Sequence, residues 1–121
     1  MTNGRWVALV MAGLAASAAA QDSAQQQTIG ALARARAVDG RLHAIIALDP
    51  TAIDQARAID ARGVRGPLAG RPVLIKDNIE AAGPLPTTAG SLALIDNVTG
   101  RDSPLVARLR AAGMVILGKT N

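Results

Sequence analysis

The chain has 121 residues, a formal net charge of +4 and no cysteine, and half of its residues are hydrophobic. This length suits one domain with a modest core, while the lack of cysteine and the single histidine, His43, argue against disulfides, metal, cofactor and His-based triad sites. The basic residues are scattered and no aromatic residues lie among them, which argues against a nucleic-acid groove.

The first twenty residues follow the order of a secretory signal peptide. Residues 1–5 are polar with one arginine, residues 6–16 are apolar, and residues 17–20 are small. We therefore expect an exported, periplasmic or secreted protein that is cleaved near Ala20. A membrane span needs about 20 apolar residues, more than this run offers, so no stable membrane anchor is expected. The alternative is a buried, alanine-rich N-terminal helix.

The next segment, residues 21–27, is polar and is predicted to be a short linker to a domain over 28–121. From Thr28, apolar residues recur at helical spacing, and residues 39–40 (Asp-Gly) are typical of a helix end. The apolar run over 42–48 then predicts a buried strand.

Two further helix starts are marked by a capping residue followed by proline, at Asp49-Pro50 and Ser103-Pro104. Glycines end these helices, at Gly63 and Gly113. Apolar strands and one short helix complete the series, over 73–75, 114–117 and 91–95 respectively. Strands that alternate with helices predict an α/β fold with a partial mixed, largely parallel sheet and flanking helices.

Lys76 directly follows the strand predicted over 73–75. Sites in open α/β sheets gather at the carboxyl ends of strands, and a lysine that loses its hydration there becomes neutral more readily and can act as a base. Adjacent strand residues face opposite sides, so Asp77 is expected to point away from Lys76 and brace the loop, as is Asn78. The alternative is that Lys76 merely ends a strand and reaches solvent.

Three separated segments carry recognisable motifs. They are residues 66–79 around Lys76, residues 86–91 (Pro-Thr-Thr-Ala-Gly-Ser) and residues 111–121, which end in Gly-Lys-Thr-Asn. In this order they resemble the amidase-signature family of Ser–cis-Ser–Lys amidases. The resemblance covers about residues 28–121 and identifies an N-terminal fragment of an amidase domain. With the export signal, it is most similar to the exported peptide-amidase branch.

The resemblance implies an enzyme that hydrolyses the carbon–nitrogen bond of a small amide or peptide amide. Lys76 would take a proton from a bridging serine, which in turn activates a nucleophilic serine. Asp77, Asn78 and Ser91 would support the site, although Ser91 also suits a helix cap. Neither family serine can be placed in this chain, so we expect a truncated domain that is inactive without the remainder of the amidase domain.

Two other functions remain open at this point. One is a non-catalytic exported α/β module that binds a partner. The other is a subunit of a tRNA-dependent amidotransferase, which works in the cytoplasm and would be excluded by cleavage after Ala20. Residues 118–120 (Gly-Lys-Thr) resemble the end of a phosphate loop, but the apolar strand before them excludes that interpretation.

Overall fold

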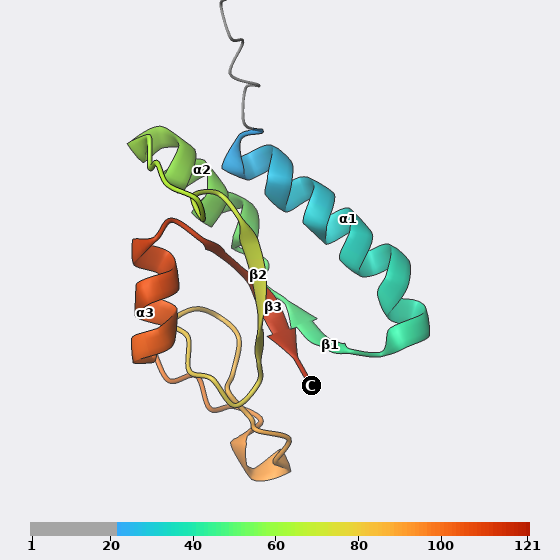
Figure 1. Ribbon diagram of the computed structural model, residues 1–121. Coiled ribbons are helices and arrows are strands. Elements are labelled where there is room, and N and C mark those ends of the chain that lie inside the picture. Colours follow the sequence, from blue (N-terminus) through green and yellow to red (C-terminus); the bar gives the residue numbers. More distant parts are fainter. Residues whose placement is uncertain (1–21) are drawn as a thin grey trace, which may run out of the picture.

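The computed structural model describes residues 22–121, so the predicted signal peptide and its cleavage near Ala20 lie outside the described residues. Within this part, helices and strands alternate along the chain (Figure 1). They are α1 (Ala24–Leu42), β1 (Ile45–Leu48), α2 (Ala52–Arg62), β2 (Pro72–Lys76), the 3₁₀ helix η1 (Leu92–Leu94), α3 (Pro104–Ala111) and β3 (Val115–Thr120). No helix in residues 22–121 combines the length and apolar character needed to cross a membrane.

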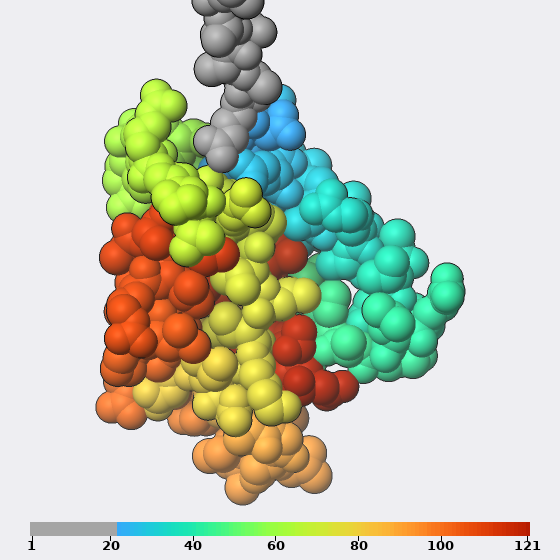
Figure 2. Space-filling view, in the orientation of Figure 1, coloured from blue at the N-terminus to red at the C-terminus, as the bar shows by residue number. Residues whose placement is uncertain are grey.

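The three strands form one mixed sheet in the order β1-β3-β2. β3 lies in the centre, antiparallel to β1 and parallel to β2. The predicted α/β fold with a mixed sheet and flanking helices is therefore confirmed, and one of the two strand pairs is parallel. In the space-filling view β2, in yellow, runs along the surface between α3 and α1 (Figure 2).

Both faces of the sheet are covered by helices. On one face, apolar residues of α1 and α2 pack against Val115 and Leu117 of β3. On the other face, Val106 of α3 packs with Ile75 of β2 and Ile116 of β3. The side chains of β3 alternate between the two clusters because successive strand residues point to opposite faces. The central strand is buried on both sides for this reason.

Helix α1 begins four residues before the predicted start at Thr28, so residues 24–27, expected to be linker, are helical. Ser23 caps this end, since its hydroxyl accepts from the backbone N–H of Gln26 and the Gln26 side chain accepts from the Ser23 N–H. Asp60 of α2 adds a tertiary cap by accepting from the N–H of Ala24 at 2.8 Å.

The strand predicted over 42–48 is shorter, because α1 continues through Leu42. The helix ends at His43, which adopts the left-handed conformation and is exposed, contrary to the buried strand position expected for it. Asp39 Oδ1 accepts from the N–H groups of both Ala44 and Ile45 at 2.9 Å, which turns the chain into β1. Asp39 therefore shapes the turn after the helix.

The predicted start of α2 is two residues early, because Thr51 occupies the N-cap position. The Asp49 carboxylate is buried and accepts from the backbone N–H of Thr51 at 2.7 Å, so it organises the turn before the helix. The other predicted cap is confirmed: the Ser103 hydroxyl accepts from the N–H of Val106, with Pro104 in the first turn. Gly63 ends α2 in the left-handed conformation, as expected.

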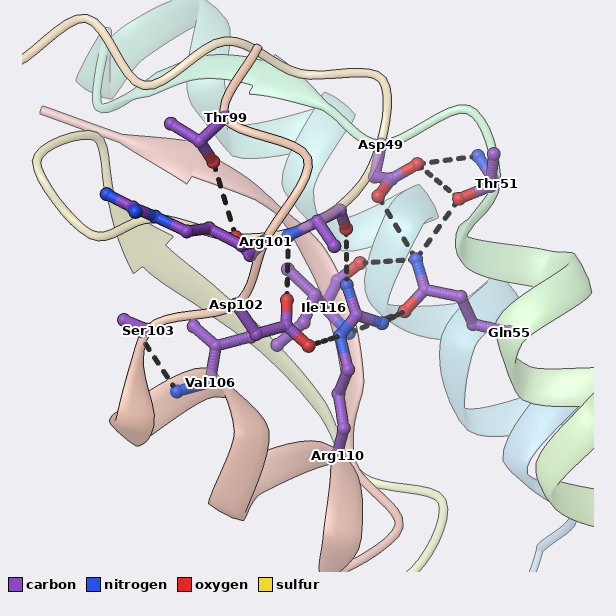
Figure 3. A network of polar contacts seen from close by, with 11 residues as sticks. Asp49, Thr51, Gln55, Thr99, Arg101, Asp102, Ser103, Val106, Arg110 and Ile116 are labelled. Atoms are coloured by element: carbon purple, nitrogen blue, oxygen red, sulfur yellow. Dashed lines mark hydrogen bonds and ion pairs between the residues drawn. The ribbon is translucent and has the colours of Figure 1, made fainter.

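A polar network ties α2 to α3 beside β3 (Figure 3). Arg110 donates to the Gln55 side-chain oxygen and to the Ala82 carbonyl, each at 2.9 Å. Its Nε lies 3.1 Å from Asp102 Oδ2, and Asp102 also accepts from the Ala82 N–H at 2.7 Å. The Gln55 oxygen accepts in addition from the N–H of Ile116 at 3.1 Å. These contacts link both helices to the central strand.

Candidate active site at the carboxyl ends of β2 and β3

A pocket of about 310 Å³ opens where β2 and β3 end. It is lined by residues from β1 and β2, from the loop after β2 and from the end of the chain after β3: Ile46, Lys76, Asp77, Asn78, Ala89, Gly90 and Asn121. A larger hollow of about 520 Å³ lies beside α2 and α3, but its basic side chains are Arg62 and Arg110. Arginine stays protonated in proteins and is a poor base, so the pocket with Lys76 is the better candidate.

Lys76 is the last residue of β2, and its side chain is exposed. The loss of hydration expected for Lys76 is therefore not provided by residues 22–121. None of the ion pairs within these residues involves it. Its backbone is well fixed, since the carbonyl oxygen accepts from the N–H of Ile79 at 3.0 Å and closes a turn. Lys76 thus projects into open space from a rigid base.

Asp77 lies on the opposite side from Lys76 and is buried. Its carboxylate accepts from the hydroxyl of Thr88 and, at 3.4 Å, from the Thr88 N–H. Its own N–H donates to the carbonyl of Thr120 at 2.9 Å, and its carbonyl accepts from the N–H of Ala89 at 3.3 Å. Asp77 therefore fastens both β3 and the far end of the following loop, which is the bracing geometry expected for it.

Asn78 and Ser91 are both exposed, and their positions differ. Asn78 lines the pocket beside Lys76. Ser91 precedes η1 at the N-cap position, but its side chain makes no capping hydrogen bond. Ser91 is also not among the residues that line the pocket. The structure therefore brings Lys76, Asp77 and Asn78 together and leaves Ser91 outside this group.

Lys119 is the buried lysine of this region, and the sequence did not single it out as part of the site. The strand predicted over 114–117 runs on to Thr120, so Lys119 lies within β3 and is only 2% exposed. Its Nζ donates to the carbonyl of Ile79 at 2.6 Å and to the hydroxyl of Thr87 at 2.9 Å. One ammonium group thus holds two points of the loop after β2.

The charges around Lys119 act in opposite directions. Burial lowers the pKa of Lys119, and the carboxylates of Asp77 and Glu80 partly oppose this effect. The pKa of Glu80 is itself lowered, chiefly by the hydrogen bonds that it accepts from Arg101 at 2.9 Å. Lys119 therefore lies near two carboxylates but donates its direct hydrogen bonds to neutral oxygens.

One sequence signal pointed towards this contact. Lys119 continues directly from the apolar residues 114–117, and strand alternation places it on the same face as Ile116 once the bulge between Ile116 and Gly118 is known. That bulge depends on pairing with β2, which no local pattern reveals. Thr87 belongs to the motif over residues 86–91, but its partner lies 32 residues away in the sequence.

Chemically, the pocket offers an accessible amine on a fixed turn. The amine of Lys76 is free to meet a group supplied from outside residues 22–121, while Asn78 and Asn121 add amide side chains to the same wall. Gly90, with a φ of 77°, keeps that wall open. Such a site can take up or hand on a proton, but the side chains that line the pocket within residues 22–121 include no nucleophile next to Lys76.

Residues 27–121 match the family model described as Amidase. The chain is 48% identical over 116 residues to a glutamyl-tRNA(Gln) amidotransferase subunit from Salinispora arenicola, which covers 92% of this chain and 23% of that protein. It superposes on the native peptide amidase of Stenotrophomonas maltophilia with a TM-score of 0.77 and 46% identity, over 83% of this chain and 22% of that one. The corresponding amidotransferase subunit from Thermotoga maritima gives a TM-score of 0.62 at 25% identity, over 81% and 20%. The chain thus spans less than a quarter of the length of these relatives.

Proposed function

The chain belongs to the amidase family, and from this we propose that it supplies the lysine-bearing part of an enzyme that hydrolyses carbon–nitrogen amide bonds. The position of Lys76 carries the proposal. It stands at the end of β2, on the rim of a pocket, with its amine unpaired by any ion pair of residues 22–121. A base must be able to reach the proton that it removes, and this amine can.

In the proposed mechanism, Lys76 accepts a proton from a bridging serine, which takes one from the serine that attacks the amide carbonyl. Two described serines are unsuited to these roles, because Ser23 and Ser103 cap helices. Ser91 lies outside the pocket lining. We therefore propose that both serines come from the remainder of the amidase domain. The same part would cover Lys76 and remove its hydration, as a neutral amine requires.

The proposed substrate class is a small amide or peptide amide, and the proposed location is outside the cytoplasm. The likeness to the Stenotrophomonas maltophilia peptide amidase and the leader-like order of residues 1–20 support this combination. A second candidate rests on the 48% identity to the Salinispora arenicola amidotransferase subunit. In that case the chain would belong to a protein that works with partners in the cytoplasm.

Export separates the two candidates. The chain is expressed from its own Met1 in a bacterial host, and the N-terminus of the product is determined by mass spectrometry. We expect a periplasmic or secreted product that begins at Gln21. A cytoplasmic product that keeps residues 1–20 would favour the amidotransferase candidate.

A chimera tests the chemistry. Residues 22–121 replace the matching segment of the Stenotrophomonas maltophilia peptide amidase, and ammonia release from a peptide amide is measured. We expect activity that Lys76→Ala lowers about a hundredfold or more. Arg71→Ala is the matched control, because Arg71 is an exposed basic residue at the other end of β2 and should leave activity unchanged. Activity that does not depend on Lys76 would favour a non-catalytic scaffold.

A further inference from the structure

The loop between β2 and η1 is held at two distant points by one buried side chain. Lys119 Nζ donates to Ile79, close to the start of the loop, and to Thr87, close to its end. Both acceptors are neutral oxygens, and Lys119 is only 2% exposed. A buried ammonium is costly unless its hydrogen bonds are satisfied, so these two contacts explain how the charge is kept in the interior.

The first of these contacts leads directly to Lys76. The Ile79 peptide is held from both sides, since its N–H donates to the Lys76 carbonyl at 3.0 Å and the Ile79 carbonyl accepts from Lys119 at 2.6 Å. Lys119 therefore fixes the turn that begins at Lys76, although strand alternation separates the two side chains. The connection passes through a single residue.

The second contact leads to the opposite wall of the pocket. Thr87 is tied to Lys119, and the adjacent Thr88 is tied to Asp77. The next two residues, Ala89 and Gly90, line the pocket that contains Lys76. The Thr87 backbone also exchanges hydrogen bonds with Asn97, which attaches it to the segment after η1. The position of this wall thus depends on how residues 87 and 88 are anchored.

We propose that Lys119 is a positioning residue for Lys76: with Ile79 and Thr87 it sets the direction in which the Lys76 amine leaves β2 and its separation from the Ala89–Gly90 wall. This inference rests on the proposed role of Lys76 as a base. Transfer of a proton requires precise placement of the amine, so loosening the loop lowers kcat more than it weakens substrate binding. A residue that only stabilised the fold would not show this separation.

The experiment uses the same chimera with three variants. Thr87→Val removes one acceptor of Lys119 with little change in shape, Thr87→Ser restores the hydroxyl, and Arg101→Met breaks the nearby exposed ion pair with Glu80 as a matched control. Lys119→Met serves as a fourth, more severe variant. For each protein, kcat, KM and amide hydrogen exchange over residues 77–90 are measured.

We expect Thr87→Val to lower kcat about tenfold, as for the loss of one hydrogen bond to a charged group, with KM little changed. Thr87→Ser should restore kcat, and Arg101→Met should leave it unchanged. Exchange over 77–90 should accelerate in Thr87→Val and more in Lys119→Met, while exchange in α1 stays the same. Unchanged kcat in Thr87→Val, or an equal loss in Arg101→Met, would overturn the inference.

The two proposals fail in different ways. A wild-type chimera that is inactive, or one that stays active as Lys76→Ala, overturns the proposed function and with it the catalytic part of this inference. Exchange over 77–90 that is unaffected in both Thr87→Val and Lys119→Met overturns the contact itself, even if Lys76 proves to be essential.

Discussion

Arg110 and Gln55 lie 55 residues apart in the sequence and are joined by a hydrogen bond of 2.9 Å between the Arg110 guanidinium and the Gln55 side-chain oxygen. The same guanidinium pairs with Asp102, and the same oxygen accepts from β3 at Ile116. Two helices on opposite faces of the sheet are thereby connected around the start of the central strand (Figure 3).

This connection predicts a large effect of Arg110→Met on stability. The Arg110 and Asp102 side chains are 28% and 20% exposed, so the substitution leaves partly buried acceptors without a partner. We expect the free energy of unfolding to fall by about 2 kcal/mol, measured by urea denaturation followed by circular dichroism. Arg57→Met is the control, because Arg57 and Asp54 form an exposed ion pair whose loss should cost less than about 0.5 kcal/mol. Equal losses in both variants would contradict the prediction.

Gly118 gives a second prediction, because a side chain there has no room. A Cβ added at Gly118 would lie 2.3 Å from the Ala47 carbonyl oxygen and 2.9 Å from the Leu48 Cα, both in the backbone of β1. Gly118→Ala should therefore force β1 away from β3 and destabilise the chain by about 2 kcal/mol or more.

Gly40 offers the matched control for this substitution. It lies in α1 with nothing within 4 Å of an added Cβ. Gly40→Ala should stabilise the chain by about 0.5–1 kcal/mol, because glycine loses more conformational freedom in a helix than alanine does. The urea midpoints of the two variants should move in opposite directions, and a shared direction would count against the close approach of β1.

The third prediction concerns alkaline pH. Burial lowers the pKa of Lys119 below its ordinary value of 10.5. Between these two values the unfolded chain binds a proton that the folded chain has released, so the free energy of unfolding rises with pH through this interval. The chain has no tyrosine or cysteine, which leaves few other groups to titrate between about pH 8 and 11.

Urea midpoints measured from about pH 8 to pH 10.5 check this expectation. The rise should disappear in Lys119→Met and persist in Lys76→Met, since Lys76 is exposed in residues 22–121. A rise of the same size in Lys119→Met would show that another group is responsible.

The fourth prediction is that the 121-residue chain does not hydrolyse peptide amides by itself. The pocket holds an accessible amine, but residues 22–121 place no serine among the side chains that line it. Purified chain incubated with a peptide amide should release no ammonia above background. Release that is abolished by Lys76→Ala would show that a nucleophile is present after all.

Local patterns predicted much of this fold because they report local forces. The proline after a capping residue at Ser103 indicated the start of α3, and Gly63 indicated the end of α2. Lys76 was found in the same way, since an apolar run followed by a lysine marks the end of a strand. These features depend on neighbours within a few residues, which the sequence displays directly.

Other elements were misplaced because their causes lie far along the chain. Helix α1 starts at Ala24 because Asp60 caps it from α2, 36 residues later. It also runs past Asp39, whose carboxylate binds the turn into β1 instead of ending the helix. Polar residues near a helix end can serve several partners, and only packing selects among them.

The two lysines separate what each level of description decided. The sequence by itself determined the order of helices and strands, the family motifs and the place of Lys76 at the carboxyl end of β2. Only the tertiary structure decided that Lys119 is buried and that its ammonium holds Ile79 and Thr87. The reason is physical: burial and hydrogen bonding of a charged group depend on the bulge in β3 and on a loop whose contact residue Thr87 lies 32 residues away.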